Sequence, residues 1–226
     1  MRILVIALGW FLATVAASKL AAQTPHDYRA VIDSAVNMRV EFALEYEVSN
    51  NRELPFYFEM GVPLNDAGVT MRSRFPNTGN MGELVFATKD GTFLEYVTIS
   101  AGTVPAGTLA DRMDIVFSLI EAQIYPSLQL GDDAQALGAR QSEIAGLPAV
   151  EYVALAEDPA NGPLAARIVG VLAPNETDVL FFVQQTMRDR MGLGGPDELT
   201  QTYAGTILAS LTFQAYRDSD GKLVKF

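Results

Sequence analysis

The sequence predicts an α+β fold, a single domain in which helices pack against an antiparallel sheet. Three observations lead to this class. Short extended runs bounded by turn residues are the most frequent predicted element along the 226 residues. Asp90-Gly91 separates two such runs, which is the signal of a β-hairpin. Two segments with apolar residues at helical spacing, 109–125 and 196–211, interrupt the strands at the middle and the end of the chain.

Residues 1–22 have the pattern of a cleavable signal peptide. Arg2 gives a positive start, residues 3–15 are mostly apolar, and small residues follow. The apolar run ends before Lys19, well short of the roughly 20 residues that a helix needs to cross a bilayer. An uncleaved N-terminal anchor is the alternative interpretation. The candidate cleavage positions, with the favoured one first, are Ala22, Ala17 and Ser18.

The chain is acidic and contains no cysteine. Its 16 basic and 27 acidic residues give a net charge of −11, and loss of Arg2 and Lys19 with the signal peptide makes it −13. Such a surface repels nucleic acid and anionic lipid, so we expect neither as a partner and no stable membrane insertion after cleavage. An exported domain without disulfides favours a periplasmic or secreted protein of a Gram-negative bacterium. We expect one domain at 23–226, with its core at about 38–214.

The first half of the chain is predicted to be rich in strands. A short helix is expected at 25–37. A half-buried strand is predicted at 39–48, where apolar residues fill one face and Arg39, Glu41, Glu45 and Glu47 share the other. Further extended runs follow at 55–62 and 69–75. The predicted hairpin joins 84–88 to 93–99.

The helix predicted at 109–125 has local start and stop signals. Thr108 can cap its N-terminus with Asp111 three residues on, and Pro126 is expected to end it. The polar, small residues of 131–141 predict a connector or a marginal helix.

The second half is predicted to contain the centre of the sheet. A strand is expected from Gly146 to Leu155. The runs 164–172 and 179–186 are apolar on both faces, which predicts central, covered strands. Pro196 is placed for the first turn of the last helix, and a polar tail is expected to begin at 218–221. The predicted buried stripe of that helix consists of Leu199, Tyr203, Ile207, Leu208 and Leu211.

The order of these elements resembles the PsbP-like superfamily, which includes PsbP and DcrB. The similarity is carried by the strand entry Ile144-Ala145-Gly146-Leu147-Pro148-Ala149-Val150-Glu151-Tyr152 and by a closing helix that ends in Ser210-Leu211-Thr212-Phe213. Members more often end on Ser-Phe directly, so this ending departs from the pattern. The resemblance covers roughly Tyr57 to Phe213. It implies an α/β/α sandwich and an accessory or assembly role through protein binding, with no catalytic residues to carry over.

The usual catalytic and metal-binding patterns are absent from the sequence or incomplete in it. The single histidine, His26, lies beside the cleavage region, where a solvated terminal residue is the simpler interpretation. With no cysteine and only one histidine, a typical zinc site is excluded, and no cofactor is expected. The carboxylate pairs Asp111/Asp114 and Asp132/Asp133 are explained by a helix N-terminus and a loop. Residues 218–221 begin like a calcium loop and 192–195 like a phosphate-binding loop, but neither pattern is completed.

Arg72 and Arg74 form the densest positive spot. Being two apart on an extended run, they share a sheet face and are candidate contacts for an anion or an acidic partner loop, with a solvated face as the alternative. The first functional hypothesis is a non-enzymatic accessory protein that binds a protein partner in the cell envelope through a sheet edge or a loop-rich end. The second is a carrier of a small molecule or lipid, and the third a carboxylate-dependent hydrolase. The carrier pocket would be lined by Phe117, Tyr152, Phe181 and Phe182.

Overall fold

The computed structural model describes residues 37–40, 56–63, 69–74, 80–175, 177–218 and 220–225. The predicted signal peptide, the helix expected at 25–37, His26 and most of the strand expected at 39–48 lie outside these residues.

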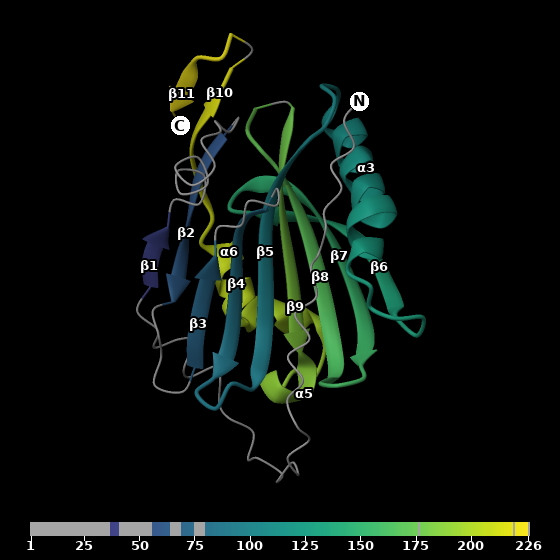
Figure 1. The fold of residues 1–226 in the computed structure, drawn as a ribbon. Helices are drawn as coiled ribbons and strands as arrows, with labels where there is room; N and C mark the ends of the chain where they lie inside the picture. Colours follow the sequence, from purple (N-terminus) through teal and green to yellow (C-terminus); the bar gives the residue numbers. More distant parts are fainter. Residues whose placement is uncertain are drawn as a thin grey trace.

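A seven-stranded antiparallel sheet forms the centre of the protein, and Figure 1 shows it running from β3 at one edge to β6 at the other. The predicted α+β fold is confirmed. The strands, in their order across the sheet, are β3 (Val69–Arg74), β4 (Asn80–Thr88), β5 (Phe93–Thr103), β9 (Asp178–Met187), β8 (Gly162–Leu172), β7 (Leu147–Asp158) and β6 (Gln135–Ile144).

A smaller sheet joins the start of the described chain to its end. β10 (Thr212–Arg217) pairs with β2 (Phe56–Pro63) on one side and with β11 (Leu223–Lys225) on the other, and β1 (Asn37–Val40) pairs with β2. The polar tail expected from residue 218 is therefore wrong, because this segment is the turn of a hairpin. The Asp218 carboxylate accepts the N–H groups of Asp220 and Lys222, as an Asx turn does.

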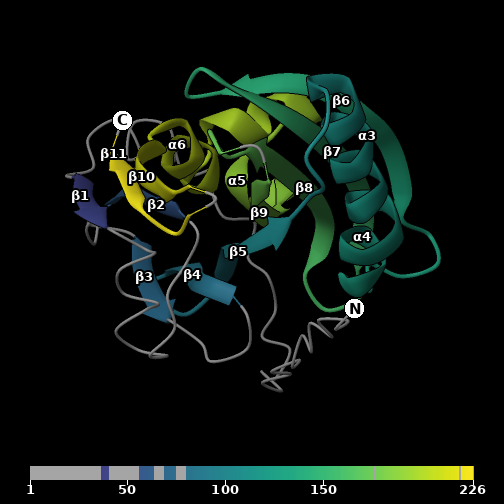
Figure 2. The same cartoon turned by 90° about the horizontal axis from the view of Figure 1, so that it is seen from above.

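Helical segments cover the two faces of the seven-stranded sheet, and Figure 2 shows α3 and α6 on opposite sides of it. The predicted capping box is confirmed, because Thr108 and Asp111 exchange hydrogen bonds at the start of α3. Pro126 does not end the helical run, which continues to Ser127. The segments are α3 (Leu109–Leu119), π-helix η1 (Ile120–Ile124), α4 (Tyr125–Ser127), α5 (Arg188–Met191), 3-10 helix η2 (Pro196–Gln201) and α6 (Tyr203–Ala209).

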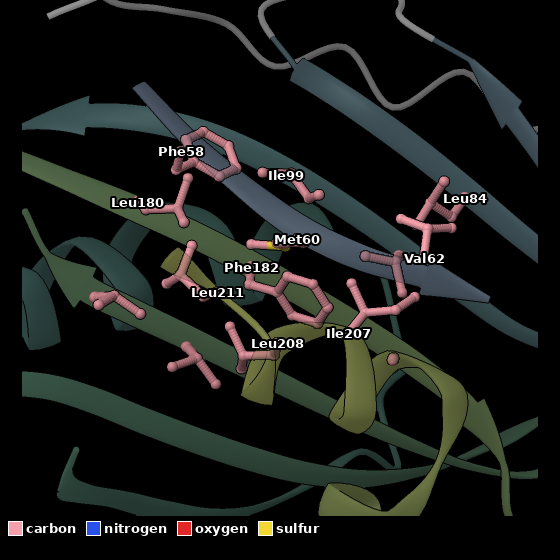
Figure 3. Packing of buried hydrophobic residues seen from close by; sticks show 14 of the residues in the cluster. Phe58, Met60, Val62, Leu84, Ile99, Leu180, Phe182, Ile207, Leu208 and Leu211 are labelled. Atoms are coloured by element: carbon pink, nitrogen blue, oxygen red, sulfur yellow. The ribbon is translucent and has the colours of Figure 1, made fainter. Parts of the chain in front are cut away.

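The last helix was predicted as one element and is two. Thr202 is extended between η2 and α6, and its side chain accepts the Gly205 N–H to cap α6. The predicted stripe is buried throughout, from Leu199 to Leu211. Figure 3 shows Ile207, Leu208 and Leu211 packed toward β2 and the central strands.

The core on the α3 face is separate from the one on the α6 face. Val116 and Ile120 of the helical run pack on Tyr152 and Phe181 of the sheet. Gly170 permits this approach, because a Cβ there would lie 2.5 Å from Val116 Cγ1 and 3.1 Å from the Phe181 ring. Side chains therefore fill the space between helix and sheet at this point.

Candidate functional site

The edge strand β6 is the most exposed strand of the large sheet. The connector or marginal helix predicted for 131–141 is wrong, because β6 (Gln135–Ile144) is a strand that pairs with β7 at every residue except Leu137, which lies in a bulge. Most of its side chains are exposed, including Leu137 at 45%. Among the residues that the structure describes, no strand pairs with its other side. Within the described part of the chain, β6 therefore presents a long, unpaired sheet edge.

The turn between β6 and β7 determines which backbone groups point outward. Ala145 and Gly146 have φ values of 53° and 78°, as a two-residue type I′ hairpin requires. Ile144 and Leu147, which flank the turn, then form a hydrogen-bonded pair, and pairs alternate from there. Ala139, Gln141 and Glu143 consequently direct their N–H and C=O groups away from β7. We call these outward groups the β6 edge.

A row of polar side chains, buried except at its β6 end, crosses the sheet on the α6 face. The pairing register places Arg140 opposite Glu151, Arg167 opposite Gln184, and Glu95 opposite Thr186. These six residues come from β6, β7, β8, β9 and β5. We call this row the polar belt: Glu95, Arg140, Glu151, Arg167, Gln184 and Thr186.

Glu151 anchors β6 at one end of the polar belt. Its carboxylate accepts from Arg167 Nε at 2.5 Å and from Arg140 Nε at 2.9 Å. Glu151 and Arg167 are each 3% exposed, whereas the Arg140 side chain is 57% exposed. Burial pushes the pKa of Glu151 upward, but the two arginines outweigh it and hold that pKa below its usual range. Arg140 also reaches Asp197 Oδ1 of η2 at 3.4 Å.

Glu95 occupies the other end of the polar belt and binds the start of α6. Its Oε1 accepts from Gln184 Nε2 at 2.9 Å and Thr186 Oγ1 at 2.6 Å, and its Oε2 accepts from the Ala204 N–H at 2.9 Å. Glu95 is 0% exposed, and burial raises its pKa despite these donors. Gln184 Nε2 also contacts Thr202 Oγ1 at 2.8 Å, so the belt fixes both η2 and α6 on the sheet.

The sequence analysis missed the polar belt, although a signal was present. Glu95, Glu151 and Arg167 each interrupt a strand at a position whose neighbours two residues away are apolar. A charged residue on an apolar strand face is buried only when it has partners, and all three have them.

The carboxylates named by the sequence analysis do not form a catalytic arrangement. Asp111 and Asp114 are exposed on α3, where Asp111 belongs to the capping box. Asp132 and Asp133 are exposed before β6. Glu95 and Glu151, the two buried glutamates of the polar belt, are three strands apart, which corresponds to roughly 14 Å between strand axes. Paired carboxylates in glycosidases lie about 5 to 9.5 Å apart.

The four aromatic residues proposed for a carrier pocket do not face one space. Tyr152 and Phe181 belong to the core on the α3 face, with Phe117 packed against it, whereas Phe182 belongs to the core on the α6 face. The sheet separates the two groups. The carrier hypothesis therefore loses the pocket on which it depended.

The arginine pair lies at the opposite edge of the sheet from β6. Arg72 is exposed on β3, opposite Val85 of β4, and the register places Arg74 opposite Glu83. The side chain of Arg74 lies outside the described residues. The anion or partner contact at Arg72 and Arg74 stays a prediction.

Two kinds of feature are absent from the described ranges. No helix there has the length and apolar composition to cross a membrane. No group of three His, Cys, Asp or Glu side chains is placed there to hold a metal ion.

No protein-family model and no curated protein matches the sequence. Several solved structures do. Cyanobacterial PsbP from Synechocystis sp. PCC 6803 is 15% identical, with 79% of this chain and 92% of that chain covered and a TM-score of 0.46. LpqN of Mycobacterium tuberculosis, described as involved in cell envelope biogenesis, is 13% identical, with 80% and 94% covered and a TM-score of 0.42. The Saccharomyces cerevisiae Ran-binding protein Mog1p is 12% identical, with 79% and 96% covered and a TM-score of 0.40.

One of these structures, cyanobacterial PsbP, bears the name of the superfamily that the sequence resembles. Identities and TM-scores of this size describe a similar arrangement of elements, and they assign no activity or partner to this chain.

Proposed function

We propose that this protein is an exported, non-enzymatic accessory protein of the cell envelope that binds a partner protein through the β6 edge. The observation that carries the proposal is the exposure of β6 along nearly its whole length while β7 pairs with its other side. A free strand of this length offers main-chain donors and acceptors to an extended segment of another protein. Natural sheets usually protect such edges, so an open one calls for an explanation.

The protection of β6 is limited to local features. A bulge between Ala136 and Gly138 interrupts the register, and Arg140 and Glu143 carry charge. Past the bulge, regular pairing runs from Gly138 to Ile144, which leaves the β6 edge as a straight docking stretch. Charges on an edge discourage unselective aggregation and still permit a chosen partner.

The placement of the acidic residues favours binding over hydrolysis. The two buried glutamates of the polar belt are occupied by hydrogen bonds that fix strands and helices, and the separation of their strands does not suit a shared substrate. The pairs Asp111/Asp114 and Asp132/Asp133 are exposed to solvent and lack the buried setting in which a carboxyl group acts as a general acid. The signal-peptide pattern of residues 1–22 supports the export part of the proposal.

The proposal is tested by crosslinking in a Gram-negative host that expresses the full chain with its own leader. We expect the mature protein in the periplasmic fraction, beginning at Gln23. A photo-crosslinking residue at position 141, at the centre of the β6 edge, is expected to capture a discrete partner protein. The same residue at position 89, in the exposed β4–β5 turn, serves as the matched control.

Two substitutions at Gln141 separate edge pairing from side-chain contact. Gln141→Pro removes an outward N–H and leaves the hydrogen bonds to β7 in place, whereas Gln141→Thr keeps the N–H. With the photo-crosslinking residue moved to a neighbouring position of β6, we expect Gln141→Pro to abolish capture of the partner and Gln141→Thr to preserve it. Equal recovery with both variants, or a hydrolytic activity with no captured partner, would overturn the proposal. Thermal unfolding of both variants verifies that each is folded.

A further inference from the structure

A depression of 320 Å³ lies immediately before β6 in the chain. Its walls include Tyr125 and Pro126 of α4, Leu130, and Asp132. This volume is at the lower end for small-molecule pockets, and it suits one or two side chains of a binding partner. The lining ends at Ala134, and β6 begins at the next residue, Gln135. The depression therefore lies at the start of β6, and the β6 edge follows it along the strand.

The residues of the depression combine an apolar wall with negative charge. Pro126, Leu130 and the half-buried Tyr125 ring supply apolar surface, and Asp132 supplies a carboxylate. Asp133 and Glu121 are exposed nearby on either side of this segment. An aliphatic stem that ends in a positive charge matches this arrangement, since the stem packs on the wall while the charge meets the carboxylate and the ring.

The direction of strand addition determines which end of a partner reaches the depression. Every strand pair of the large sheet is antiparallel, and antiparallel pairing is slightly more stable per residue than parallel pairing. A segment added antiparallel to β6 runs from the level of Ile144 toward that of Gln135. Its C-terminal end then lies beside the depression.

We infer that the β6 edge receives an extended segment of a basic partner protein, and that a Lys or Arg at the C-terminal end of this segment occupies the depression against Tyr125 and Asp132. This inference rests on the proposed function and adds the chemistry and direction of the partner. The net charge of −11 also attracts a positively charged partner over longer distances.

The inference is tested with fluorescein-labelled peptides and the purified protein, by fluorescence anisotropy at low and high salt. Each peptide alternates Val and Thr over eight residues. The first ends in Lys, the second ends in Glu, and the third carries the Lys at its N-terminal end. We expect the first to bind about ten-fold more tightly than the other two at low salt, with a smaller ratio at high salt.

Two single-charge variants locate the preference. Asp132→Asn is expected to reduce the preference for the C-terminal Lys to about two-fold, the scale of an exposed charge contact. Asp220→Asn removes the same charge from the exposed β10–β11 turn and is expected to leave the preference unchanged. The inference is wrong if the Lys and Glu peptides bind equally, if both variants behave alike, or if the N-terminal Lys is preferred.

The Gln141 variants distinguish failure of this inference from failure of the proposed function. If Gln141→Pro weakens the binding of every peptide and Lys gives no advantage, the proposed binding at the β6 edge is supported and the inference of a basic partner is wrong. If Gln141→Pro and Gln141→Thr bind peptides equally, the β6 edge is not the docking surface and both proposals fail. A concentration-dependent dimer that Gln141→Pro dissociates would assign the edge to a second copy of this chain and would likewise overturn the inference.

Discussion

Glu95 and Glu151 are buried on the same face of the same sheet, yet their surroundings act on them in opposite directions. Glu95 is surrounded by neutral donors, and burial raises its pKa. Burial also acts to raise the pKa of Glu151, but Arg140 and Arg167 hold that pKa below the usual range. The difference teaches that burial alone does not decide the charge state of a carboxyl group. The charge of its hydrogen-bond partners decides it.

The two glutamates also have opposite effects on stability as pH changes. Because the folded pKa of Glu151 is lowered, its stabilisation is present above the ordinary pKa of Glu and is lost as pH falls through the lower folded value. The folded pKa of Glu95 is raised, so its contribution to the free energy of unfolding declines as pH rises from the ordinary value toward the raised one.

Removing the Glu151 carboxylate is expected to have the largest effect. Glu151→Ala leaves the Arg167 guanidinium buried without its partner, and we expect the free energy of unfolding to fall by about 3 to 5 kcal/mol. Urea denaturation at pH 7 measures the loss. The double variant Glu151→Leu/Arg167→Met removes both charges and is expected to recover much of it. A double variant as unstable as the single one would show that the ion pair is not the cause.

Glu95→Gln is expected to have an intermediate effect that depends on pH. An amide cannot accept hydrogen bonds on both sides, so one donor, such as the Ala204 N–H, loses its acceptor at a cost of about 1 to 3 kcal/mol. As pH rises above about 4.5, this deficit relative to the wild type is expected to shrink, because the wild type alone must ionise a buried carboxyl group. Urea denaturation from pH 4 to 8 measures the difference.

Glu151→Gln provides the contrast in the same pH series. Its deficit is expected to grow as pH rises from 3 to 5, since only the wild type gains the paired carboxylate. Parallel pH profiles for the two variants would remove the distinction between the two ends of the polar belt.

Asp197→Asn is expected to have the smallest effect. The Arg140–Asp197 pair is 3.4 Å long, and the Asp197 side chain is 88% exposed. Solvent screens such a pair, so we expect the free energy of unfolding to change by less than about 0.5 kcal/mol. A loss above about 1 kcal/mol, measured by the same denaturation, would mean that the exposed end of the belt fixes η2 as firmly as the buried end does.

Elements with strong local signals were predicted from the sequence. The Asp90-Gly91 hairpin, the Thr108 cap and the apolar strands β8 and β9 depend on residues close together in the chain. The edge strand β6 was missed because its side chains are exposed, so it carries no burial pattern and is held mainly by pairing with β7. Two features could not be predicted without knowing how the strands are paired: which backbone groups of β6 point outward, and which side chains meet in the polar belt. Composition and residue spacing do not contain the register between strands.

The small sheet also has a consequence for the order of folding. Gly61 of β2 and Ser210 are hydrogen-bonded across 149 residues of sequence, and β10 begins two residues after Ser210. Until the segment that becomes β10 is available, β2 lacks its pairing partner on that side and Phe58 lacks the Phe213 ring that packs beside it. The aromatic cluster that closes this end of the molecule is therefore assembled only after nearly the whole chain has been synthesised, and closing so long a loop is a slow step.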